Sequence, residues 1–291
     1  MLKYSKSEKV FEIFLYIILG IIAFTTIYPF IHSFSISLSD RGEALRTGWH
    51  FYPKKVDLES YRRVLSSSQI WIGYANTIFR TVVGTFLSIL FTIFAAYPLS
   101  KKYLPFRSFF ISMIFFTMLF GGGMIPTFIL IKDIGLYNNR WVYILPGIAN
   151  AYNTFVMINF LKNIPASLEE SARIDGAADI KVLFKIVIPL STPVIATMAL
   201  WNGVGHWNSF MDNLLYVTEK DKFVLQEVLR QILIQDRTDS FAALLKTVEK
   251  PPAGESLKMA TVMVSIIPVI IAYPFLQRYF EKGVLLGSIK G

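Results

Sequence analysis

The sequence contains no cysteine and comparatively little charge. Without cysteine, disulfide bonds and metal sites built from thiolates are excluded. Charged residues make up 17% of the 291 residues and hydrophobic residues 54%, whereas about 25% of the residues of a soluble protein are charged. The charged residues also lie in clusters between long apolar segments. These features indicate a protein embedded in membrane lipid.

The basic excess does not indicate a nucleic-acid partner. The formal net charge is +9, but the lysines and arginines flank apolar segments and form no continuous basic face. Lysine and arginine accumulate beside membrane spans, and this tendency accounts for the charge. We therefore expect no nucleic acid among the partners.

Several motifs that carry chemistry are also missing. No Gly-x-x-x-x-Gly-Lys-Ser/Thr phosphate loop occurs, so the chain is not expected to bind or hydrolyse ATP. The three histidines, His32, His50 and His206, are far apart in the sequence and lack the spacing of metal ligands. No Ser-His-Asp arrangement stands in a recognisable context. The sequence thus predicts no catalytic residue, no bound cofactor and no metal, and the chain is not expected to be an enzyme.

Six apolar segments are long enough to cross a bilayer, which takes about 20 residues. The sequence therefore predicts an all-α, polytopic membrane protein, formed by one domain over residues 1–291 with six transmembrane helices. The predicted spans cover residues 11–37, 75–99, 107–131, 141–162, 186–210 and 259–280. The glycines 121–123 in the third span favour close helix packing or a break. Arg80, at the start of the second apolar segment, is a polar candidate within a span, and the alternative is that it extends to the membrane interface.

The basic residues of the short loops predict the orientation. Lysines and arginines are frequent in the N-terminal tail, after the second span, between the fourth and fifth spans, and near the C-terminus. Six crossings place these four segments on the same side of the membrane. Both termini are therefore predicted to be cytoplasmic.

The charged loop 163–188, between the fourth and fifth spans, has regular helix signals. Ser167 and Glu170 have the spacing of a capping box, and Gly176 suits the left-handed residue that ends a short helix. Asp179 is predicted to cap a second helix that stops at Pro189. The sequence predicts a helix–turn–helix that serves as a docking element; an ordinary polar loop is the alternative.

This loop resembles the signature loop of bacterial binding-protein-dependent ABC importer permeases. The family pattern is Glu-Ala-Ala, three residues, Gly, nine residues, Ile, one residue, Leu-Pro. The residues that match, with Ser171 for the first Ala and Ile188 for the Leu, are Glu170, Ser171, Ala172, Gly176, Ile186, Ile188 and Pro189.

Two further segments resemble the carbohydrate (maltose-type) permeases of this family. The sequence HWNSF, residues 206–210, is similar to their Trp-Asn-x-Phe element. The C-terminal residues Gly283, Gly287, Lys290 and Gly291 follow their Gly-x-x-x-Gly-x-x-Lys-Gly ending. The resemblance is strongest to the subgroup that handles complex polysaccharides and lipo-oligosaccharides.

The resemblance implies the type I ABC importer permease fold, with a cytoplasmic coupling helix between helices 4 and 5. It implies three kinds of protein partner: a homologous second permease, two ATP-binding subunits that hold ATP and Mg, and an extracytoplasmic solute-binding protein. It also implies a location in the bacterial plasma (inner) membrane. The residues it assigns to ATPase coupling are Glu169, Glu170, Ala172, Asp175, Gly176, Ala177 and Pro189.

Polar and aromatic side chains in the fourth and fifth spans are candidates for a substrate path. Amides pair with hydroxyl groups, and aromatic faces cover the C–H surface of a sugar. The candidate residues are Asn150, Tyr152, Asn153, Trp201, Asn202, His206, Trp207 and Asn208. The alternative is that they form hydrogen bonds between helices and an aromatic belt at the interface.

The sequence thus predicts the permease subunit of an importer for oligosaccharides or polysaccharide fragments, an acidic saccharide among them. One alternative is the same fold importing an amino acid, a peptide or a polyamine. A secondary transporter is a further alternative, although it should show buried ionisable residues and inverted repeats. A purely structural scaffold is the last, and it would not need the capped loop.

Overall fold

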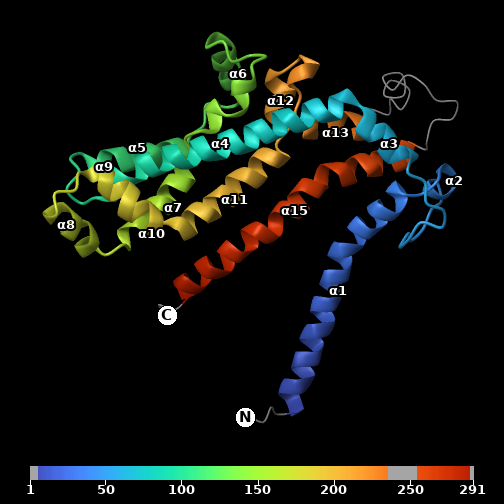
Figure 1. The fold of residues 1–291 in the computed structure, drawn as a ribbon, viewed down its shortest axis with the longest axis horizontal. Coiled ribbons are helices and arrows are strands. Elements are labelled where there is room, and N and C mark those ends of the chain that lie inside the picture. The colour runs from blue at the N-terminus through green and yellow to red at the C-terminus, as the bar shows by residue number, and fades with distance from the viewer. Residues whose placement is uncertain (1–5, 235–253, 289–291) are drawn as a thin grey trace. The chain divides into compact units, whose positions relative to one another are not determined.

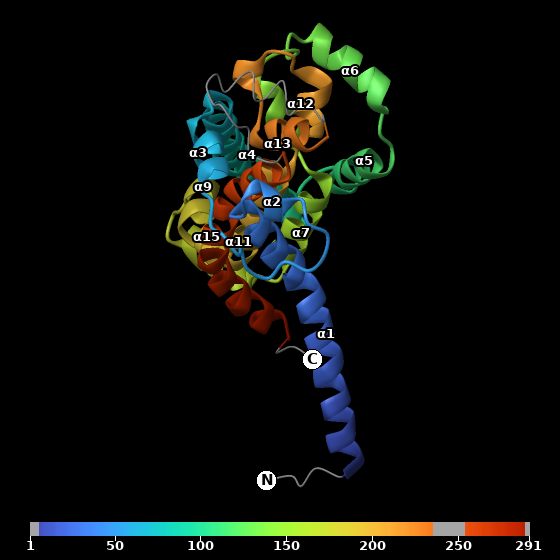
Figure 2. The same cartoon turned by 90° about the vertical axis from the view of Figure 1, so that its right-hand side faces the viewer.

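The computed structural model describes residues 6–234 and 254–288. The chain divides into two compact units, residues 1–70 with 229–267 and residues 71–228 with 268–291. Helices form almost all of the regular structure (Figures 1 and 2). Within the described residues, β pairing is limited to one isolated bridge between Ser39 and Val56.

The first unit is built on α1 (Lys6–Ser37) and the loop that follows it. The loop carries α2 (Arg41–Ala44), and α3 (Glu59–Ser66) follows. The buried carboxylate of Glu43 accepts hydrogen bonds from the backbone N–H groups of Lys54, at 2.8 and 2.9 Å, and of Lys55. The first turns of α15 (Gly254–Ser288) also belong to this unit. The loop is therefore held in one conformation by its own polar contacts.

The second unit is a bundle of helices around α4 (Ser68–Ser100). Its other elements, in chain order, are α5 (Arg107–Leu119), α6 (Met124–Asp133), η1 (Arg140–Tyr143), η2 (Leu145–Gly147), α7 (Ala151–Lys162), α8 (Ala166–Ile174), α9 (Asp179–Val182), the π-helical turn η3 (Leu183–Val187), α10 (Ile188–Leu190), α11 (Thr192–Asn208), α12 (Met211–Tyr216), η4 (Lys220–Lys222) and the start of α13 (Leu225–Ile234). In Figure 1, α8 and α9 lie at one end of α4 and α12 lies toward the other end.

The core of this unit lies between α4, α7, α11 and the segment 182–187. Ile93 and Ala96 of α4, Met157 of α7 and Met198 of α11 are all nearly inaccessible. Leu183 joins the same cluster from the π-helical turn. Close side-chain packing of this kind is what holds helices together in a membrane, where lipid is as apolar as the core.

Three of the six predicted spans are single helices and three are bent pairs. The single helices cover Lys9–Ser37, Ser68–Ser100 and Gly254–Pro274. The pairs are Arg107–Leu119 with Met124–Asp133, bent by 111°, Arg140–Gly147 with Ala151–Lys162, bent by 48°, and Asp179–Leu190 with Thr192–Asn208, bent by 77°. By length and composition, six crossings result if each pair is one span.

Each break has a local chemical cause. Gly123 is left-handed, with φ +84°, and the Thr127 hydroxyl donates to its carbonyl at 2.7 Å. The predicted break within glycines 121–123 is therefore confirmed. The alternative, close helix packing, is not seen at Gly121, since nothing lies within 4 Å of a Cβ placed there. The break in the fourth span follows the short helix η2, and the side chain of Asn150 caps α7 by accepting from the Asn153 N–H at 3.0 Å.

The predicted stop at Pro189 is wrong, because the helical segment continues through Pro189 to Leu190. Pro189 lies in the first turn of α10, where a missing N–H is tolerated. The bend comes at Ser191, because Pro193 has no N–H to donate to the Pro189 carbonyl. The Thr192 hydroxyl donates to that carbonyl instead, at 2.7 Å.

Polar contacts fasten α12 and the loop after it to the bundle. The side-chain oxygen of Asn213, which is buried, accepts hydrogen bonds from the Tyr143 hydroxyl and the Val224 N–H, both at 2.8 Å. The side-chain amide of Asn76 donates to the carbonyls of Asp221 and Phe223 at 3.0 and 2.9 Å. This loop is thus fixed against α4 and η1.

The replacement Asn213→Ala should lower the free energy of unfolding by about 1–3 kcal/mol, because it leaves the buried Val224 N–H without an acceptor, whereas the Tyr143 hydroxyl keeps the Lys222 carbonyl at 2.8 Å. The apparent melting temperature of the detergent-purified protein is the measurement. Asn208→Ala, at an exposed position, should leave the melting temperature unchanged. Equal melting temperatures for the two variants would contradict this account of the loop.

Candidate functional site

The first helix of the charged loop begins earlier than the sequence predicts. Pro165 is the N-cap residue of α8, and no side chain caps this helix end. Ser167 therefore lies inside the first turn, and the predicted capping box of Ser167 and Glu170 is wrong. The reason is that the helix starts directly after the proline, so Ser167 already has helical backbone angles.

The turn that ends α8 is as predicted. Gly176 is left-handed, with φ +81°, and the Ala177 N–H donates to the Ala172 carbonyl at 2.9 Å, which is the pattern of a glycine-terminated helix. A side chain at this position would be strained by about 1 kcal/mol or more, although nothing lies within 4 Å of the Cβ it would add. The predicted role of Gly176 in the turn is confirmed.

Asp179 does not cap the second helix, and this prediction is wrong. Ala178 is the N-cap residue of α9, with no side-chain hydrogen bond, and Asp179 is the first helical residue. Its carboxylate accepts from Arg173 Nη2 and Nε at 3.0 and 3.2 Å instead. Burial is the largest single effect and lowers the pKa of Arg173, but the hydrogen bonds and charge interactions with Asp179 and Tyr103 together raise this pKa. The pair closes the turn between α8 and α9.

The adjacent glutamates of α8 face in different directions. Glu169 is buried, with 6% of its surface exposed, and both carboxylate oxygens lie 2.5 Å from Lys101 Nζ. The Tyr97 hydroxyl is 3.4 Å from the same carboxylate, and Arg173 Nη2 is 3.7 Å away. The side chain of Glu170 is exposed and forms no hydrogen bond or ion pair with any residue the structure describes.

A groove of about 550 Å³ lies beside these residues, and we call it the Glu169 groove. Its lining has more basic than acidic residues and consists of Ser100, Lys101, Lys102, Tyr103, Arg107, Leu161, Lys162, Ile164, Ala166, Glu169, Glu170 and Arg173. Lys101 also lies 4.4 Å from the centre of the Tyr97 ring, a cation–π contact. The groove therefore lies between α8 and the C-terminal end of α4.

The remaining residues assigned to coupling are spread along the loop. Ala172 and Ala177 pack against the core of the second unit, and Asp175 is the C-cap residue of α8. Sequence reasoning missed two apolar side chains, Ile174 with 87% and Ile180 with 63% of its surface exposed. The sequence alone does not show that these two side chains are exposed, because their exposure depends on where α8 and α9 begin and end.

A second site lies between α4, α7 and α11, and we call it the Asn202 pocket. It encloses about 560 Å³. Six of the eight substrate-path candidates line it: Asn150, Tyr152, Asn153, Trp201, Asn202 and His206. The other lining residues are Arg80, Val142, Tyr143, Pro146, Gly147, Gly205, Ser209, Asp212 and Tyr216.

The polar groups of the Asn202 pocket include one buried amide donor that has no partner among the described residues. The side-chain amide of Asn153 donates to the side-chain oxygen of Asn202 at 3.1 Å, while Asn202 Nδ2 is buried without a partner among the described residues. The rings of Tyr152 and Trp201 lie 6.0 Å apart and are both exposed. The arrangement offers amide donors beside aromatic faces.

Two of the eight candidates lie outside this pocket. Trp207 is buried, and its ring centre is 6.3 Å from that of Tyr74. Asn208 is exposed and does not line the pocket. His206 reaches it only because Gly84 has no side chain: a Cβ there would lie 2.6 Å from His206 Nε2.

Arg80 lines this site although it was not among the substrate-path candidates. It does not extend to the interface: only 2% of its surface is exposed, and its guanidinium pairs with Asp212 and donates to the Ser209 carbonyl at 3.1 Å. The guanidinium carbon also lies 4.8 Å from the centre of the Tyr143 ring. An arginine inside an apolar segment together with an acid at the end of another was the signal.

Among the residues that the structure describes, no three His, Asp or Glu side chains are grouped so as to hold a metal ion. Of the C-terminal residues that resemble the sugar permeases, Gly283 and Gly287 lie in α15. Lys290 and Gly291 lie outside the described residues.

Residues 70–286 match the family described as the binding-protein-dependent transport system inner membrane component. The chain belongs to this family. It is therefore a transport component of the membrane with the helical type I ABC importer permease fold. The match is inconsistent with a secondary transporter or a scaffold.

Relatives and a solved structure resemble this permease over nearly its whole length. It is 40% identical over 284 residues to the polygalacturonan/rhamnogalacturonan transport system permease protein YtcP of Bacillus subtilis (strain 168), which covers 98% of this chain and 99% of the relative. Protein LplC of the same organism is 38% identical over 288 residues, or 99% and 97% of the two chains. A chain in the crystal structure of a bacterial ABC transporter involved in the import of the acidic polysaccharide alginate superimposes with a TM-score of 0.90 at 37% identity, covering 96% of this permease and 100% of that chain.

Replacing Glu169 by Gln should lower the free energy of unfolding by about 2–4 kcal/mol, because Lys101 then keeps a largely buried charge without its partner. The double variant Glu169→Gln/Lys101→Met should lose less than the sum of the single losses. Thermal unfolding of the purified permease in detergent provides the comparison. Glu170→Gln, the same change one residue on at an exposed position, is the control, and a loss of stability equal to that of Glu169→Gln would argue against the buried pair.

Proposed function

We propose that this permease is a membrane subunit of an ATP-driven importer that takes up oligosaccharides or fragments of acidic polysaccharides. The observation that carries the proposal is the Asn202 pocket, where amides and exposed aromatic rings converge. The printed names of the relatives, and of the alginate importer with the same fold, support a saccharide substrate. An amino acid or polyamine fits less well, because the charged groups of the pocket, Arg80 and Asp212, already neutralise each other.

In the proposed importer the chain crosses the bacterial inner membrane six times, with both termini in the cytoplasm. The three apolar helices and three bent pairs support this count. The basic loops support the orientation. The Glu169 groove then lies on the cytoplasmic side and the Asn202 pocket lies deeper in the membrane or toward the outer face. A homologous second permease forms the other half of the pathway, and an extracytoplasmic binding protein delivers the substrate.

The loop with α8 and α9 docks on one of two partner ATPases, which bind ATP and Mg. Glu170 faces outward without a partner among the described residues, and Ile174 and Ile180 expose apolar surface on the same loop. A protein interface takes an apolar centre with charged groups at its rim. Glu169 serves the opposite purpose: its ion pair with Lys101 fastens α8 to the end of α4.

Reversing the exposed charge with Glu170→Lys should reduce copurification of the ATPase subunits at least about fivefold, since a like charge at a protein interface is costly. The melting temperature of the isolated variant should equal that of the wild type. The measurement is the amount of ATPase retained on an affinity-tagged permease. Full retention of the ATPase would show that Glu170 lies outside the docking surface.

The saccharide assignment is tested by uptake into proteoliposomes that contain the whole transporter, with labelled oligogalacturonate and the binding protein. Asn202→Ala should reduce uptake about threefold to tenfold, because it removes an unpaired buried donor from the pocket. Asn208→Ala, the same replacement outside the pocket, should import at the wild-type rate. Both variants should retain their ATPase subunits. Wild-type uptake by the Asn202→Ala variant would remove the pocket from the substrate path.

A further inference from the structure

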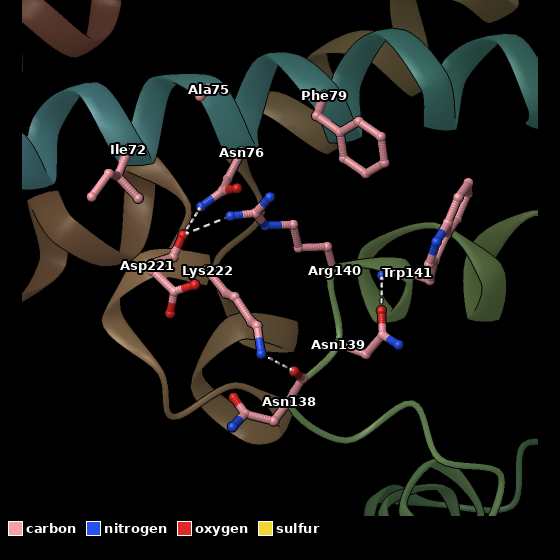
Figure 3. A pocket seen from close by; sticks show the side chains of 10 residues that line it. All are labelled: Ile72, Ala75, Asn76, Phe79, Asn138, Asn139, Arg140, Trp141, Asp221 and Lys222. Carbon is pink, nitrogen blue, oxygen red and sulfur yellow. Dashed lines mark hydrogen bonds between the residues drawn. The ribbon is translucent and has the colours of Figure 1, made fainter.

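A third cavity, of about 810 Å³, lies beside η1 and shares no residue with the Asn202 pocket. We call it the Arg140 pocket. It is lined by Ile72, Ala75, Asn76, Phe79, Asn138, Asn139, Arg140, Trp141, Asp221 and Lys222 (Figure 3). The two pockets lie on different sides of η1, since Val142 and Tyr143 of the same helix line the Asn202 pocket.

The walls of the Arg140 pocket are held in place by main-chain contacts. Arg140 Nη2 donates to the Asp221 carbonyl at 3.1 Å, and the Asn76 amide donates to the same oxygen at 3.0 Å. On the other side, Lys222 Nζ donates to the Asn138 carbonyl at 2.7 Å. Figure 3 shows these contacts drawing the turn before η1 and the loop of η4 together beside α4. The pocket is therefore built before any ligand arrives.

Several binding groups of the pocket are not used by these contacts. The other N–H groups of Arg140 have no hydrogen-bond partner, and no carboxylate lies within ion-pair distance of it, among the described residues. The side-chain oxygen of Asn139 accepts from the Trp141 N–H at 3.0 Å, which leaves its NH₂ group for a ligand. The indole of Trp141 is 42% exposed and is supported edge-on by Phe79, with ring centres 5.7 Å apart.

This set of groups suits one chemical class of ligand. A guanidinium binds a carboxylate through two parallel hydrogen bonds. A primary amide pairs with hydroxyl groups, and an exposed indole face covers the C–H surface of a pyranose ring. Lys222 is already paired with Glu219 at 2.6 Å, so Arg140 is the cation of the lining whose N–H groups remain for an anion. A uronic acid residue offers a carboxylate, hydroxyl groups and an apolar ring face together.

We propose that the Arg140 pocket is a binding subsite for a uronic acid residue of an oligosaccharide, separate from the Asn202 pocket. This inference rests on the proposed saccharide importer and specifies that its substrate is anionic. Arg140 binds the carboxylate, Trp141 stacks on the ring, and Asn139 donates to a hydroxyl group. The subsite discriminates acidic from neutral saccharides before they reach the Asn202 pocket.

The test uses the complete transporter in nanodiscs, labelled with 5-fluorotryptophan and without the binding protein. The ¹⁹F signal of Trp141, assigned with Trp141→Phe, is followed during titration with trigalacturonate and, separately, with neutral maltotriose. We expect Arg140→Gln to raise the Kd for trigalacturonate at this signal about tenfold or more, because a charge-assisted pair is lost. The weaker response to maltotriose should not change.

The matched control is Lys220→Gln, which removes a positive charge from the same loop at an exposed position outside the lining. It should bind trigalacturonate as the wild type does. The proposal is overturned if trigalacturonate leaves the Trp141 signal unmoved, or if Lys220→Gln weakens binding as much as Arg140→Gln. It is also overturned if Arg140→Gln only weakens docking of the substrate-free binding protein, which would make the pocket a protein contact.

Uptake by wild-type proteoliposomes separates this inference from the function on which it rests. If the wild type imports no oligosaccharide, the proposed function fails. If the wild type imports oligogalacturonate while the Trp141 signal does not respond to it, the function stands and the subsite alone is rejected.

Discussion

The buried ion pair of Arg80 and Asp212 is the constraint on which the second unit is arranged. An arginine in an apolar helix costs several kcal/mol unless its charge is paired and its N–H groups are bonded. Asp212 supplies the charge, the Ser209 carbonyl accepts a further hydrogen bond, and the Tyr143 ring lies over the guanidinium, while Arg80 Nε has no partner among the described residues. These three partners come from the end of α11, from α12 and from η1, so all three elements must contact α4 near Arg80. The wall of the Asn202 pocket follows from these contacts.

The sequence predicts well what depends on neighbouring residues. Long apolar segments predict the helices, and Gly176 predicts a left-handed turn because only glycine takes that conformation without strain. The helix caps of the same loop were wrong because both helices begin earlier than predicted, directly after Pro165 and at Asp179. Glu169 pairs with Lys101, 68 residues away, and Arg80 with Asp212, 132 residues away. Local spacing carries no information on such pairs.

Helix geometry explains which candidates of the fifth span reach the pocket. Asn202 and His206 are four residues apart and so share a face of α11, to which Ser209 also belongs. Trp207 is five residues from Asn202, which turns it by roughly 140° away from that face at 100° per residue. Its burial against Tyr74 is the result. Residue spacing therefore predicts that Asn202 and His206 share a face, but not that Trp201 also lines the pocket or that Gly84 on another helix makes room for His206.

α4 forms one wall of all three sites. The Glu169 groove lies at its last turn, the Asn202 pocket at Arg80, and the Arg140 pocket at Asn76 and Phe79. At 1.5 Å per residue, Arg80 and Lys101 are separated by roughly 30 Å of helix axis.

α4 is one unbroken helix, whereas the segment opposite it bends by 77° at Ser191, between α10 and α11. In the proposed importer, α4 therefore moves as one piece with α8 through the pair of Glu169 and Lys101, and α11 can change its angle at Ser191. Because the Asn202 pocket lies between a rigid wall and one that can bend, a displacement of α8 alters the shape of that pocket without breaking the pair of Arg80 and Asp212.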